Sequence, residues 1–567
     1  MLWSLFIDGK GESEMVAGRQ LSVFQRSDYL QEMAAGKLDL LVIGGGITGA
    51  GIVLDAASRG MRVGLVEKQD FGAGTSSRST KLIHGGLRYL KQGEVTLVRE
   101  VGREREILYR NAPHIVIPEK MLLPLVKGGT YGKLATSVGL WIYDRLAGVK
   151  PEERRVMLSK QQTEEQEPLL RKDILKGGGL YIEYRTDDAR LTVEVMKTAA
   201  AHGALCVNYA EAIRFLYTGQ KLIGSQVRDQ LTGEIYEVYA KQIVNAAGPW
   251  VDRLREQDGS LYGKRLHLTK GVHLVVPHRR LPLRQSVYFD VPDGRMIFAI
   301  PRDGCTYIGT TDTDYQGSLE KPRVTKEDVD YLLVAVNQMF PSVHLQPEDI
   351  VSSWAGLRPL IHEDGKSPSE LSRRDEIFHS PSGLITIAGG KLTGFRKMAE
   401  RVVDLVAKRL TELEGRQFPD CFTDRIVLSG GDFSGVGGIS AFADHLMQAA
   451  GRLGLERQHV RSLVGKYGTR AADILRRLEQ ADDRSGDPET ILMRAELWYC
   501  MEEEMAVTLN DFLIRRTGRL LFDRASVERI GPILLEEMAE AFNWTEQEKN
   551  ERLREFQEEY EAAVEFV

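Results

Sequence analysis

The sequence predicts an α/β protein with a parallel sheet near its N-terminus, a β-rich middle region and an all-helical C-terminal domain. Three observations predict this. Residues 39–67 run from an apolar segment through a small-residue helical stretch to a second apolar segment. Residues 265–312 contain short β-type runs broken by Gly and Pro, which indicates an antiparallel sheet. After about residue 415, a Gly-rich link at 429–438 leads into a tail rich in Glu, Arg, Leu and Ala with helical spacing.

Bulk composition narrows the class of protein. A chain of 567 residues is too long for one core, so we expect two or three domains. A net charge of −6 argues against a general nucleic-acid binder. No uncharged apolar run is long enough to cross a bilayer, and the N-terminus lacks the basic start of a signal peptide, so we expect a cytoplasmic or peripheral protein. The four cysteines are scattered with no C-x-x-C pair, and we expect no metal site.

The first elements form a β-α-β unit. Residues 1–36 are polar and unpatterned, and we expect a loosely docked arm. Asp39–Ile43 is a short apolar run that indicates a buried parallel strand. Ile47–Arg59 is rich in Ala and small residues and predicts a helix that stops at Gly60. Arg62–Glu67 predicts the second strand, which completes the unit.

The turn between that strand and helix has the spacing of a dinucleotide-binding site. Its glycines at G-x-G-x-x-G spacing permit a tight turn, a close backbone approach to pyrophosphate and helix packing on the strand. The amides of the helix N-terminus favour phosphate. Glu67 ends the second strand, where a carboxylate can bind ribose hydroxyls and disfavours NADP. A glycine triplet alone would equally suit an ordinary tight turn, but here every neighbouring element fits. We expect the pyrophosphate to contact Gly44, Gly45, Gly46, Ile47, Thr48 and Gly49.

The later elements follow in order. The patterns predict a helix at 94–112, strands within 204–244, a strand at 240–246 closed by Gly248-Pro249, a strand at 382–388 and a helix at 392–413. The last strand and helix are joined by a second glycine-rich turn containing Gly389, Gly390, Lys391, Leu392 and Thr393. Its amides could stabilise negative charge on a flavin. Two separated joints of this kind suit an extended FAD better than a single phosphate.

A third segment, residues 75–89, combines a dense set of hydroxyls with paired glycines. A Ser/Thr-rich surface loop would explain Thr75–Ser79 but not the following His-Gly-Gly-Leu-Arg-Tyr.

Six motifs then carry a resemblance to a known family. They are, in order, KLIHGGLRYL, VNAAGPWVD, TKGVHLVV, IGTTDTDY, WAGLRPL and AGGKLTGFRKMAE. Together they resemble the FAD-dependent, aerobic-type, quinone-linked sn-glycerol-3-phosphate dehydrogenases, from about residue 38 to beyond 400 and on into the tail. The resemblance implies FAD as cofactor on a Rossmann-like domain of the D-amino-acid-oxidase type, with a β-rich substrate domain and a helical cap. It also implies oxidation of sn-glycerol 3-phosphate to dihydroxyacetone phosphate, with electrons passed to a quinone.

The expected domain boundaries follow from the motifs and the composition. After the arm at 1–36, residues 37–413 form the FAD-binding domain, in segments of about 37–112, 190–260 and 350–413. The substrate domain is inserted at about 113–189 and 261–349, and residues 414–567 form the cap.

The resemblance also implies the site residues. Besides the two glycine-rich turns, the expected cofactor-binding residues are Glu67, Lys68, Thr75, Ser76, Ser77, Lys81, His84, Gly85, Gly86, Ala247 and Gly248. Phosphate needs fixed cations, and arginine donates bidentate hydrogen bonds to it. The expected substrate-binding residues are Arg88, Tyr89, Arg358, Arg373 and Lys391. A lone arginine is more often a surface ion pair, and Arg373 has Arg374 beside it.

For the chemistry we expect His84 and Arg358 to be catalytic. The imidazole of His84, or a water held by the site, would take the hydroxyl proton during hydride transfer to FAD. His273, in TKGVHLVV, is a second histidine of interest. One histidine among strand residues is more often a core group, and we assign it no catalytic role.

Several alternatives stay open. A glycerol-3-phosphate oxidase using O2, an amine or amino-acid oxidase, and a non-catalytic FAD-binding protein all share the fingerprint. Residues 121–146 mix large apolar residues with Lys and Arg and could lie at a membrane interface, although a segment facing the protein's own core is the commoner explanation. For the assembly, the homodimer also stays open.

Overall fold

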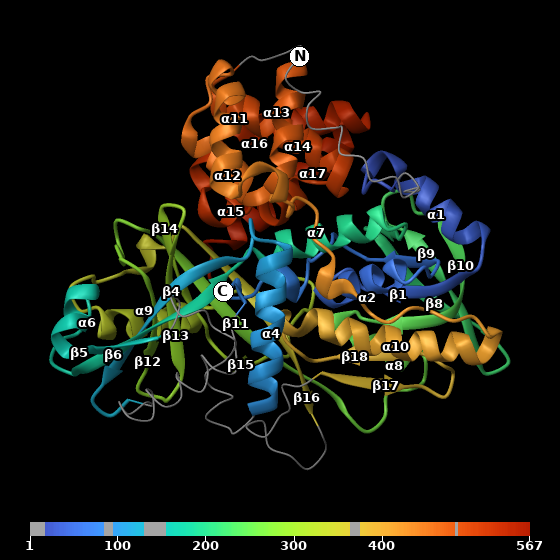
Figure 1. Ribbon diagram of the computed structural model, residues 1–567, viewed down its shortest axis with the longest axis horizontal. Coiled ribbons are helices and arrows are strands. Elements are labelled where there is room, and N and C mark those ends of the chain that lie inside the picture. The colour runs from blue at the N-terminus through green and yellow to red at the C-terminus, as the bar shows by residue number, and fades with distance from the viewer. Residues whose placement is uncertain (1–17, 84–94, 130–154, 363–374, 482–485) are drawn as a thin grey trace.

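The computed structural model describes residues 18–83, 95–129, 155–362, 375–481 and 486–567. Figure 1 shows a helical domain seated on a broad base that contains two sheets. His84, Gly85, Gly86, Arg88, Tyr89 and Arg373 lie outside the described residues.

The first sheet has a parallel centre, with strand order β18-β10-β1-β2-β7 among the described residues. Every residue of β1 is buried, as is typical of a parallel strand covered on both faces. The antiparallel strand β17 pairs with β18, and the hairpin β8–β9 continues from β10. The strand bounds are β1 Leu38–Ile43, β2 Val63–Val66, β7 Leu205–Val207, β8 Ala210–Thr218, β9 Lys221–Asp229, β10 Ile235–Asn245, β17 Glu376–His379 and β18 Ile385–Ala388.

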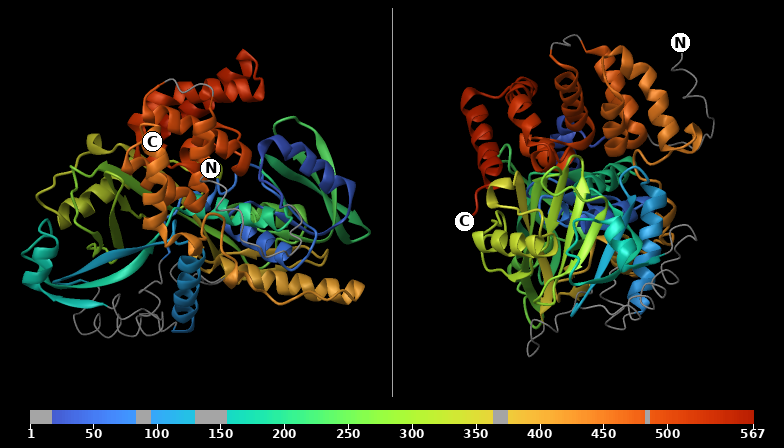
Figure 2. Two further views of the ribbon diagram at one scale, coloured as in Figure 1. Left: turned by 45° about the horizontal axis from the view of Figure 1, so that its top comes forward. Right: turned by 90° about the vertical axis from the view of Figure 1, so that its left-hand side faces the viewer.

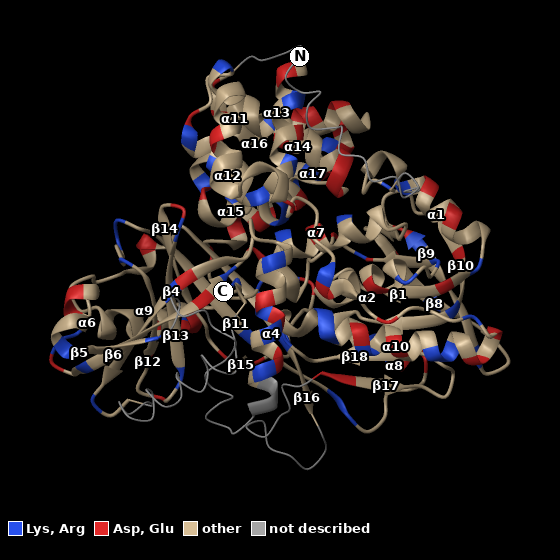
Figure 3. Cartoon of the chain, viewed as in Figure 1, with Lys and Arg blue, Asp and Glu red and all other residues tan. Residues whose placement is uncertain are grey.

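Three helices pack together beside this sheet, with α2 in contact with both α7 and α10. They span α2 Ile47–Ser58, α7 Asp188–Ala201 and α10 Phe395–Glu414. Two further helices of this part are α4 Val95–Asn111 and α8 Val251–Gln257. In Figure 3, basic and acidic residues are interspersed along α10 and along the C-terminal helices.

Residues 18–36, the described part of the N-terminal segment, differ from the loose arm that we expected for residues 1–36. Within this segment, α1 (Arg26–Ala35) packs against β10 and β7. Tyr29, Leu30 and Met33 are buried, and Arg26 forms a buried ion pair with Asp229 of β9. These three apolar residues span only about one helical turn and are surrounded by polar residues, so the sequence pattern did not predict a buried helix.

The second sheet is largely antiparallel, in the order β15-β11-β14-β13-β12-β4-β6-β3, with β16 beside β11 and β5 beside β6 among the described residues. Its strands are β3 Leu82–Ile83, β4 Ile117–Val126, β5 Val156–Ser159, β6 Leu175–Arg185, β11 Arg265–Pro277, β12 Ser286–Asp290, β13 Met296–Arg302, β14 Cys305–Gly309, β15 Thr313–Asp314 and β16 Ser352–His362. Two helices, α6 Lys160–Gln166 and α9 Lys326–Met339, lie against it.

Strand β16 changes one expected domain boundary. We placed residues 350–362 with the FAD-binding segments, yet β16 pairs with β11 from His362 opposite Arg265 to Ser352 opposite Val275. The third segment of the first sheet therefore begins near β17. Sequence patterns could not reveal this, because which strand β16 pairs with is a long-range property.

Strand β4 bears on the suggested membrane segment. Met121 to Val126 are buried and pair with β6, so this part of residues 121–146 faces the protein's own core. Residues 130–154 lie outside the described part of the chain. No helix in the described residues is long and apolar enough to span a bilayer.

The C-terminal part is helical, as expected (Figures 1 and 2). Most of its buried apolar side chains belong to the same cluster as Tyr307 and Trp354 of the second sheet, so this cap is joined to the base by a continuous core. Its helices are α11 Ile439–Arg452, α12 Arg457–Tyr467, α13 Ala471–Gln480, α14 Pro488–Glu504, the π-helical turn η12 Asp511–Arg516, α15 Arg519–Phe522, α16 Arg524–Phe542 and α17 Glu546–Ala562.

Candidate active site

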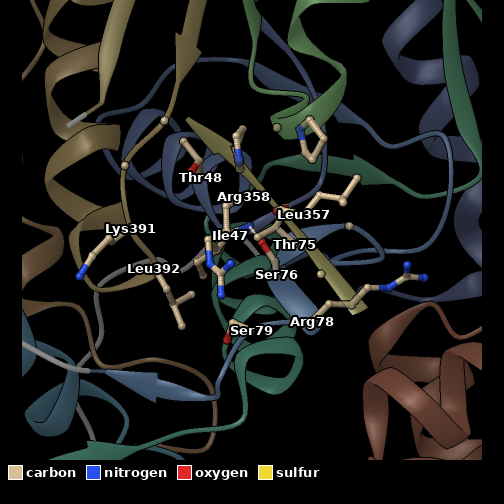
Figure 4. A pocket seen from close by; sticks show the side chains of 18 of the residues that line it. Ile47, Thr48, Thr75, Ser76, Arg78, Ser79, Leu357, Arg358, Lys391 and Leu392 are labelled. Atoms are coloured by element: carbon tan, nitrogen blue, oxygen red, sulfur yellow. Dashed lines mark hydrogen bonds between the residues drawn. The ribbon is translucent and has the colours of Figure 1, made fainter. Parts of the chain in front are cut away.

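A cavity of about 850 Å³ is lined by residues of both sheets (Figure 4). Both glycine-rich turns contribute to it, although about 340 residues separate them in the chain. The lining includes these predicted residues: Gly44, Gly46, Ile47, Thr48, Glu67, Lys68, Thr75, Ser76, Ala247, Gly248, Arg358, Gly389, Gly390, Lys391, Leu392 and Thr393.

The parallel sheet explains why these turns meet. Ile43 at the end of β1 lies opposite Asn245 of β10, and Val244 lies opposite Ile385 of β18. The three strands run in the same direction, so the turns that follow them leave from one edge. Ligands of open α/β sheets bind at this carboxyl edge.

The N-terminus of α2 forms one wall of the cavity. Its N-cap residue, Gly46, has no side chain, and Ser76 Oγ accepts a hydrogen bond of 2.9 Å from Ile47 N. Gly49 does not line the cavity. A Cβ there would lie 1.9 Å from the carbonyl oxygen of Gly44, so glycine allows α2 to pack tightly on the turn. Gly44 itself has a φ of +115°, which a side chain would oppose.

Glu67 lies where the sequence placed it, at the cavity wall. Its carboxylate accepts hydrogen bonds from Gly45 N at 2.7 Å and Gln69 N at 2.8 Å. Burial raises the pKa of this carboxyl, and the two amide bonds oppose that shift. Each carboxylate oxygen has two lone pairs, so the group can still accept bonds from ribose hydroxyls.

The neighbouring Lys68 has a partner of its own. Its ammonium lies 4.2 Å from the centre of the Trp250 ring and 3.1 Å from Glu320 Oε1. It lines the cavity and shares the Glu320 carboxylate with Arg253.

The hydroxyl-rich segment divides into lining and supporting residues. Thr75 Oγ1 donates to Leu357 O at 2.7 Å, which ties the segment to β16. Ser77 and Lys81 do not line the cavity, contrary to our expectation for cofactor-binding residues. Lys81 Nζ instead pairs with Asp188 Oδ1 at 2.5 Å and donates to Ser77 O at 3.1 Å, in a fully buried position. The sequence showed a lysine in a polar loop but not its buried partner on α7.

The second glycine-rich turn supports a short helical turn before α10. Gly389 and Gly390 have φ values of +75° and +81°, and a Cβ on Gly390 would lie 2.5 Å from Met398 Sδ. Lys391 is the N-cap of the turn and lines the cavity. In Figure 4 its side chain extends away from Arg358, so its ammonium and that guanidinium do not converge as drawn.

Arg358 projects from β16 into the cavity. Its guanidinium donates to Thr310 Oγ1 at 2.8 Å and to Asp312 Oδ1 at 3.1 Å, and it lies across Gly271 of β11, where a Cβ would be 2.3 Å from Nη2. The side chain is 31% exposed. Arg358 is therefore oriented before any ligand binds.

His273, for which we expected a core position and no catalytic role, is buried and also borders the cavity. It is 1% exposed and stacks on Trp354 with ring centres 4.7 Å apart. Its Nε2 lies 2.9 Å from Thr80 Oγ1, and its Nδ1 has no hydrogen-bond partner among the described residues. Burial, followed by the charges of Arg358 and Lys81, holds its pKa well below the usual value, so the ring is neutral at pH 7. The β11–β16 register, which places it opposite Trp354, was not readable from one sequence.

Three further cations line the cavity that the motifs did not single out: Arg78, Arg253 and Arg295. Arg253 pairs with Glu320, and Arg295 pairs with Asp293. Arg78 points away from Arg358 towards the C-terminal helices (Figure 4), and burial lowers its pKa. Basic residues outnumber acidic ones in the described lining, which suits an anionic ligand.

The cavity fits an extended dinucleotide. The N-terminus of α2 and the turn at 389–393 provide two amide-rich walls of the same cavity. Glu67 lies at the wall formed by α2. Arg358 and His273 line the part of the cavity that the second sheet forms. In the described residues, no cluster of three or more His, Cys, Asp or Glu side chains is arranged to hold a metal ion.

Comparison with known proteins gives a consistent result. A family model described as "FAD dependent oxidoreductase" matches residues 39–399, and one described as "C-terminal domain of alpha-glycerophosphate oxidase" matches residues 421–549. The aerobic glycerol-3-phosphate dehydrogenase of Bacillus subtilis (strain 168) is 55% identical over 534 residues, covering 94% of this chain and 96% of that protein.

Solved structures agree. The crystal structure of the glycerol-3-phosphate dehydrogenase from Bacillus halodurans complexed with FAD has a TM-score of 0.83 and 48% identity, covering 96% of this chain and 99% of that one. The L-alpha-glycerophosphate oxidase of Mycoplasma pneumoniae, with FAD bound, has a TM-score of 0.54 at 19% identity, over 68% of this chain and 96% of that one, and shares the fold.

Proposed function

Since the chain belongs to the family of FAD-dependent oxidoreductases that includes the aerobic glycerol-3-phosphate dehydrogenases, we propose that it oxidises sn-glycerol 3-phosphate to dihydroxyacetone phosphate and passes the electrons to a quinone. One observation carries the proposal: two amide-lined turns and a preoriented arginine border a single cavity.

The described residues divide the work between cofactor and substrate. The turn at 44–49, Glu67, and the turn at 389–393 hold FAD. Arg358 binds the substrate phosphate, because its planar guanidinium is already fixed by Thr310 and Asp312. Lys391 adds positive charge at the cavity wall. Arg88, Tyr89 and Arg373, outside the described residues, stay proposed substrate contacts, as His84, Gly85 and Gly86 stay proposed flavin contacts.

Proton removal needs an uncharged base close to the substrate. His273 meets this requirement, because its ring is neutral and one nitrogen has no described partner. A dianionic substrate would offset the field of Arg358 and raise the pKa of His273 towards neutrality, which improves its basicity. His84 is the other proposed base. Bound FAD supplies the two-electron acceptor for the hydride from the substrate's second carbon.

An anaerobic titration tests the reaction. Glycerol 3-phosphate should bleach the long-wavelength flavin absorbance stoichiometrically, whereas glycerol, which lacks the phosphate, should not at equal concentration. A flavin that keeps its absorbance with glycerol 3-phosphate would refute the proposed substrate.

The electron acceptor needs a separate test. The match of residues 421–549 to a family model named after an oxidase gives the O2-dependent reaction as a second candidate. Reoxidation by ubiquinone or menaquinone analogues, with little hydrogen peroxide, would support the dehydrogenase. One peroxide per substrate oxidised would support the oxidase.

Quinone reduction implies contact with a membrane, and we propose that the protein binds peripherally to the inner face of the cell membrane, with a homodimer as the proposed assembly. Because Met121 to Val126 are buried in a strand, they do not provide that contact. Cosedimentation with anionic vesicles, and sedimentation velocity without them, test the two parts. Protein that stays in the supernatant would contradict the proposed membrane binding, and a monomer in sedimentation velocity would contradict the proposed homodimer.

A further inference from the structure

Two arginines of the cap reach a fully buried acid beside the cofactor cavity. Asp70 lies in the loop that follows β2, between Glu67 and Thr75, which both line the cavity. Arg516 donates to both of its carboxylate oxygens, at 2.7 and 2.8 Å, and Arg515 Nε donates to Oδ2 at 2.5 Å. The side chains of Asp70 and Arg516 have no exposed area, and that of Arg515 is 9% exposed.

Other groups at the interface fix the same acid and its arginines. Asn208 Nδ2 donates to Asp70 Oδ1 at 3.0 Å and to Met505 O at 2.9 Å, so it joins the base to the cap. Asp511 accepts from Arg515 Nη2 at 2.5 Å and from Tyr209 OH at 2.7 Å. The loop is therefore held from the cap by a network and not by a single contact.

The loop is also tied to the dinucleotide turn. Gly72 N donates to Gly45 O at 2.9 Å, and Gly45 N donates to Glu67 Oε2 at 2.7 Å. These two bonds bracket Asp70 in the sequence. A displacement of Asp70 would therefore move both the Glu67 carboxylate and the backbone of the turn at Gly45.

The charges at this interface favour the ion pairs between Asp70 and the two arginines. Burial alone would raise the pKa of Asp70, but the charges of Arg516 and Arg515 lower it to about 2, so the acid is ionised at neutral pH. Removing one partner of a buried ion pair leaves an uncompensated charge, which is strongly unfavourable. The loop has little freedom to open while the cap is docked.

We propose that the cluster Asp70–Arg515–Arg516 is a positioning device by which the cap holds the loop 67–75 against the dinucleotide turn, so that retention of FAD depends on the cap. These residues act through Glu67 and Gly45 and do not themselves contact the cofactor. The inference rests on FAD binding, which the family establishes, and not on the identity of the substrate.

The test compares two full-length variants of matched burial. Asp70→Asn removes the charge that the cap arginines hold. Glu194→Gln removes an equally buried acid of α7 at the same interface, whose ion pairs are with Arg190 and Lys197 and not with the loop. The dissociation constant of FAD is measured by titrating each apoprotein and following quenching of flavin fluorescence. We expect Asp70→Asn to weaken FAD binding at least tenfold, and Glu194→Gln to change it less than twofold.

A second readout separates positioning from general destabilisation. On heating, Asp70→Asn should release its flavin at a lower temperature than that at which its circular dichroism is lost. In wild type and in Glu194→Gln the two transitions should coincide. If Asp70→Asn does not fold, Arg515→Met replaces it, since Arg516 still pairs with Asp70 in that variant. FAD affinity within twofold of wild type in the folded variant, or equal losses in variant and control, would overturn the inference. Reduction of the retained flavin by glycerol 3-phosphate, measured in the same samples, tests the proposed function independently.

Discussion

Arg358 owes its place in the cavity to a glycine on the neighbouring strand. Its guanidinium lies over Gly271 and is held by Thr310 and Asp312, so little side-chain entropy is lost when an anion binds. Arg358→Ala should weaken glycerol 3-phosphate binding by about 2–3 kcal/mol, the lower part of the range for a buried charge pair, because the side chain is 31% exposed. The half-saturation point of anaerobic flavin bleaching measures this.

Arg279→Ala provides the control, because Arg279 is exposed and does not line the cavity. It should titrate as wild type does. Wild-type affinity in Arg358→Ala would remove Arg358 from the phosphate site.

His114 gives a prediction about pH at the residue scale. It is 1% exposed, and neither ring nitrogen has a hydrogen-bond partner among the described residues. Burial, then the charges of Arg190 and Lys197, lowers its pKa to about 3. The His114 imidazole is therefore protonated below about pH 6.5 in the unfolded chain but stays neutral in the folded chain. As a result, the free energy of unfolding falls as pH falls below about 6.5. Buried His273 acts in the same direction.

Replacing His114 with Leu should remove the proton that this residue binds on unfolding. Between pH 7.5 and pH 5.5, the free energy of unfolding should fall by about 1.4 kcal/mol less in His114→Leu than in wild type. Urea unfolding at the two pH values measures the difference. An unchanged pH dependence would mean that His114 is protonated or solvated in the folded protein.

At the scale of elements, the turn between β1 and α2 has the strictest requirement. A Cβ at Gly49 would lie 1.9 Å from Gly44 O, so Gly49→Ala must push α2 away from the strand and widen the turn. We expect the variant to purify with little FAD and to bind added FAD more than a hundredfold more weakly. Flavin absorbance per protein and an FAD titration measure the two effects.

Gly465→Ala is the matched substitution elsewhere. Gly465 lies within α12, where a Cβ would meet nothing within 4 Å. This variant should keep its FAD and gain about 0.5–1 kcal/mol of stability from the better helix former. Full FAD occupancy in Gly49→Ala would show that the turn can relax without cost.

The same scale separates what the sequence could predict from what it could not. The strand–turn–helix joints at 38–58 and 385–414 were predicted correctly, because apolar runs and glycine spacing are local signals. The positions of Lys81 and His273 depend on residues far away in the chain, Asp188 for Lys81 and Thr80 for His273. The pairing of β16 with β11 is also a long-range property, and no motif within β16 predicts it.

For the whole molecule, FAD should act as a structural link between base and cap. The cap shares an apolar cluster with the second sheet, and its arginines hold the loop beside the cavity. A ligand that binds only the folded state stabilises it, by about 2.7 kcal/mol at a hundredfold excess over its dissociation constant. Because base and cap are coupled, this gain should reach both.

Removing FAD should therefore lower the unfolding temperature of the cap as well as that of the base. Hydrogen exchange of the apoprotein should accelerate in η12 and α15, which lie near Asp70 and the second sheet, and in the loop 67–75. It should change little in α17, whose side chains are not buried in the core. Exchange rates in η12 and α15 that are equal with and without FAD would show that the cap folds independently of the cofactor, because a coupled interface must transmit the loss of bound ligand.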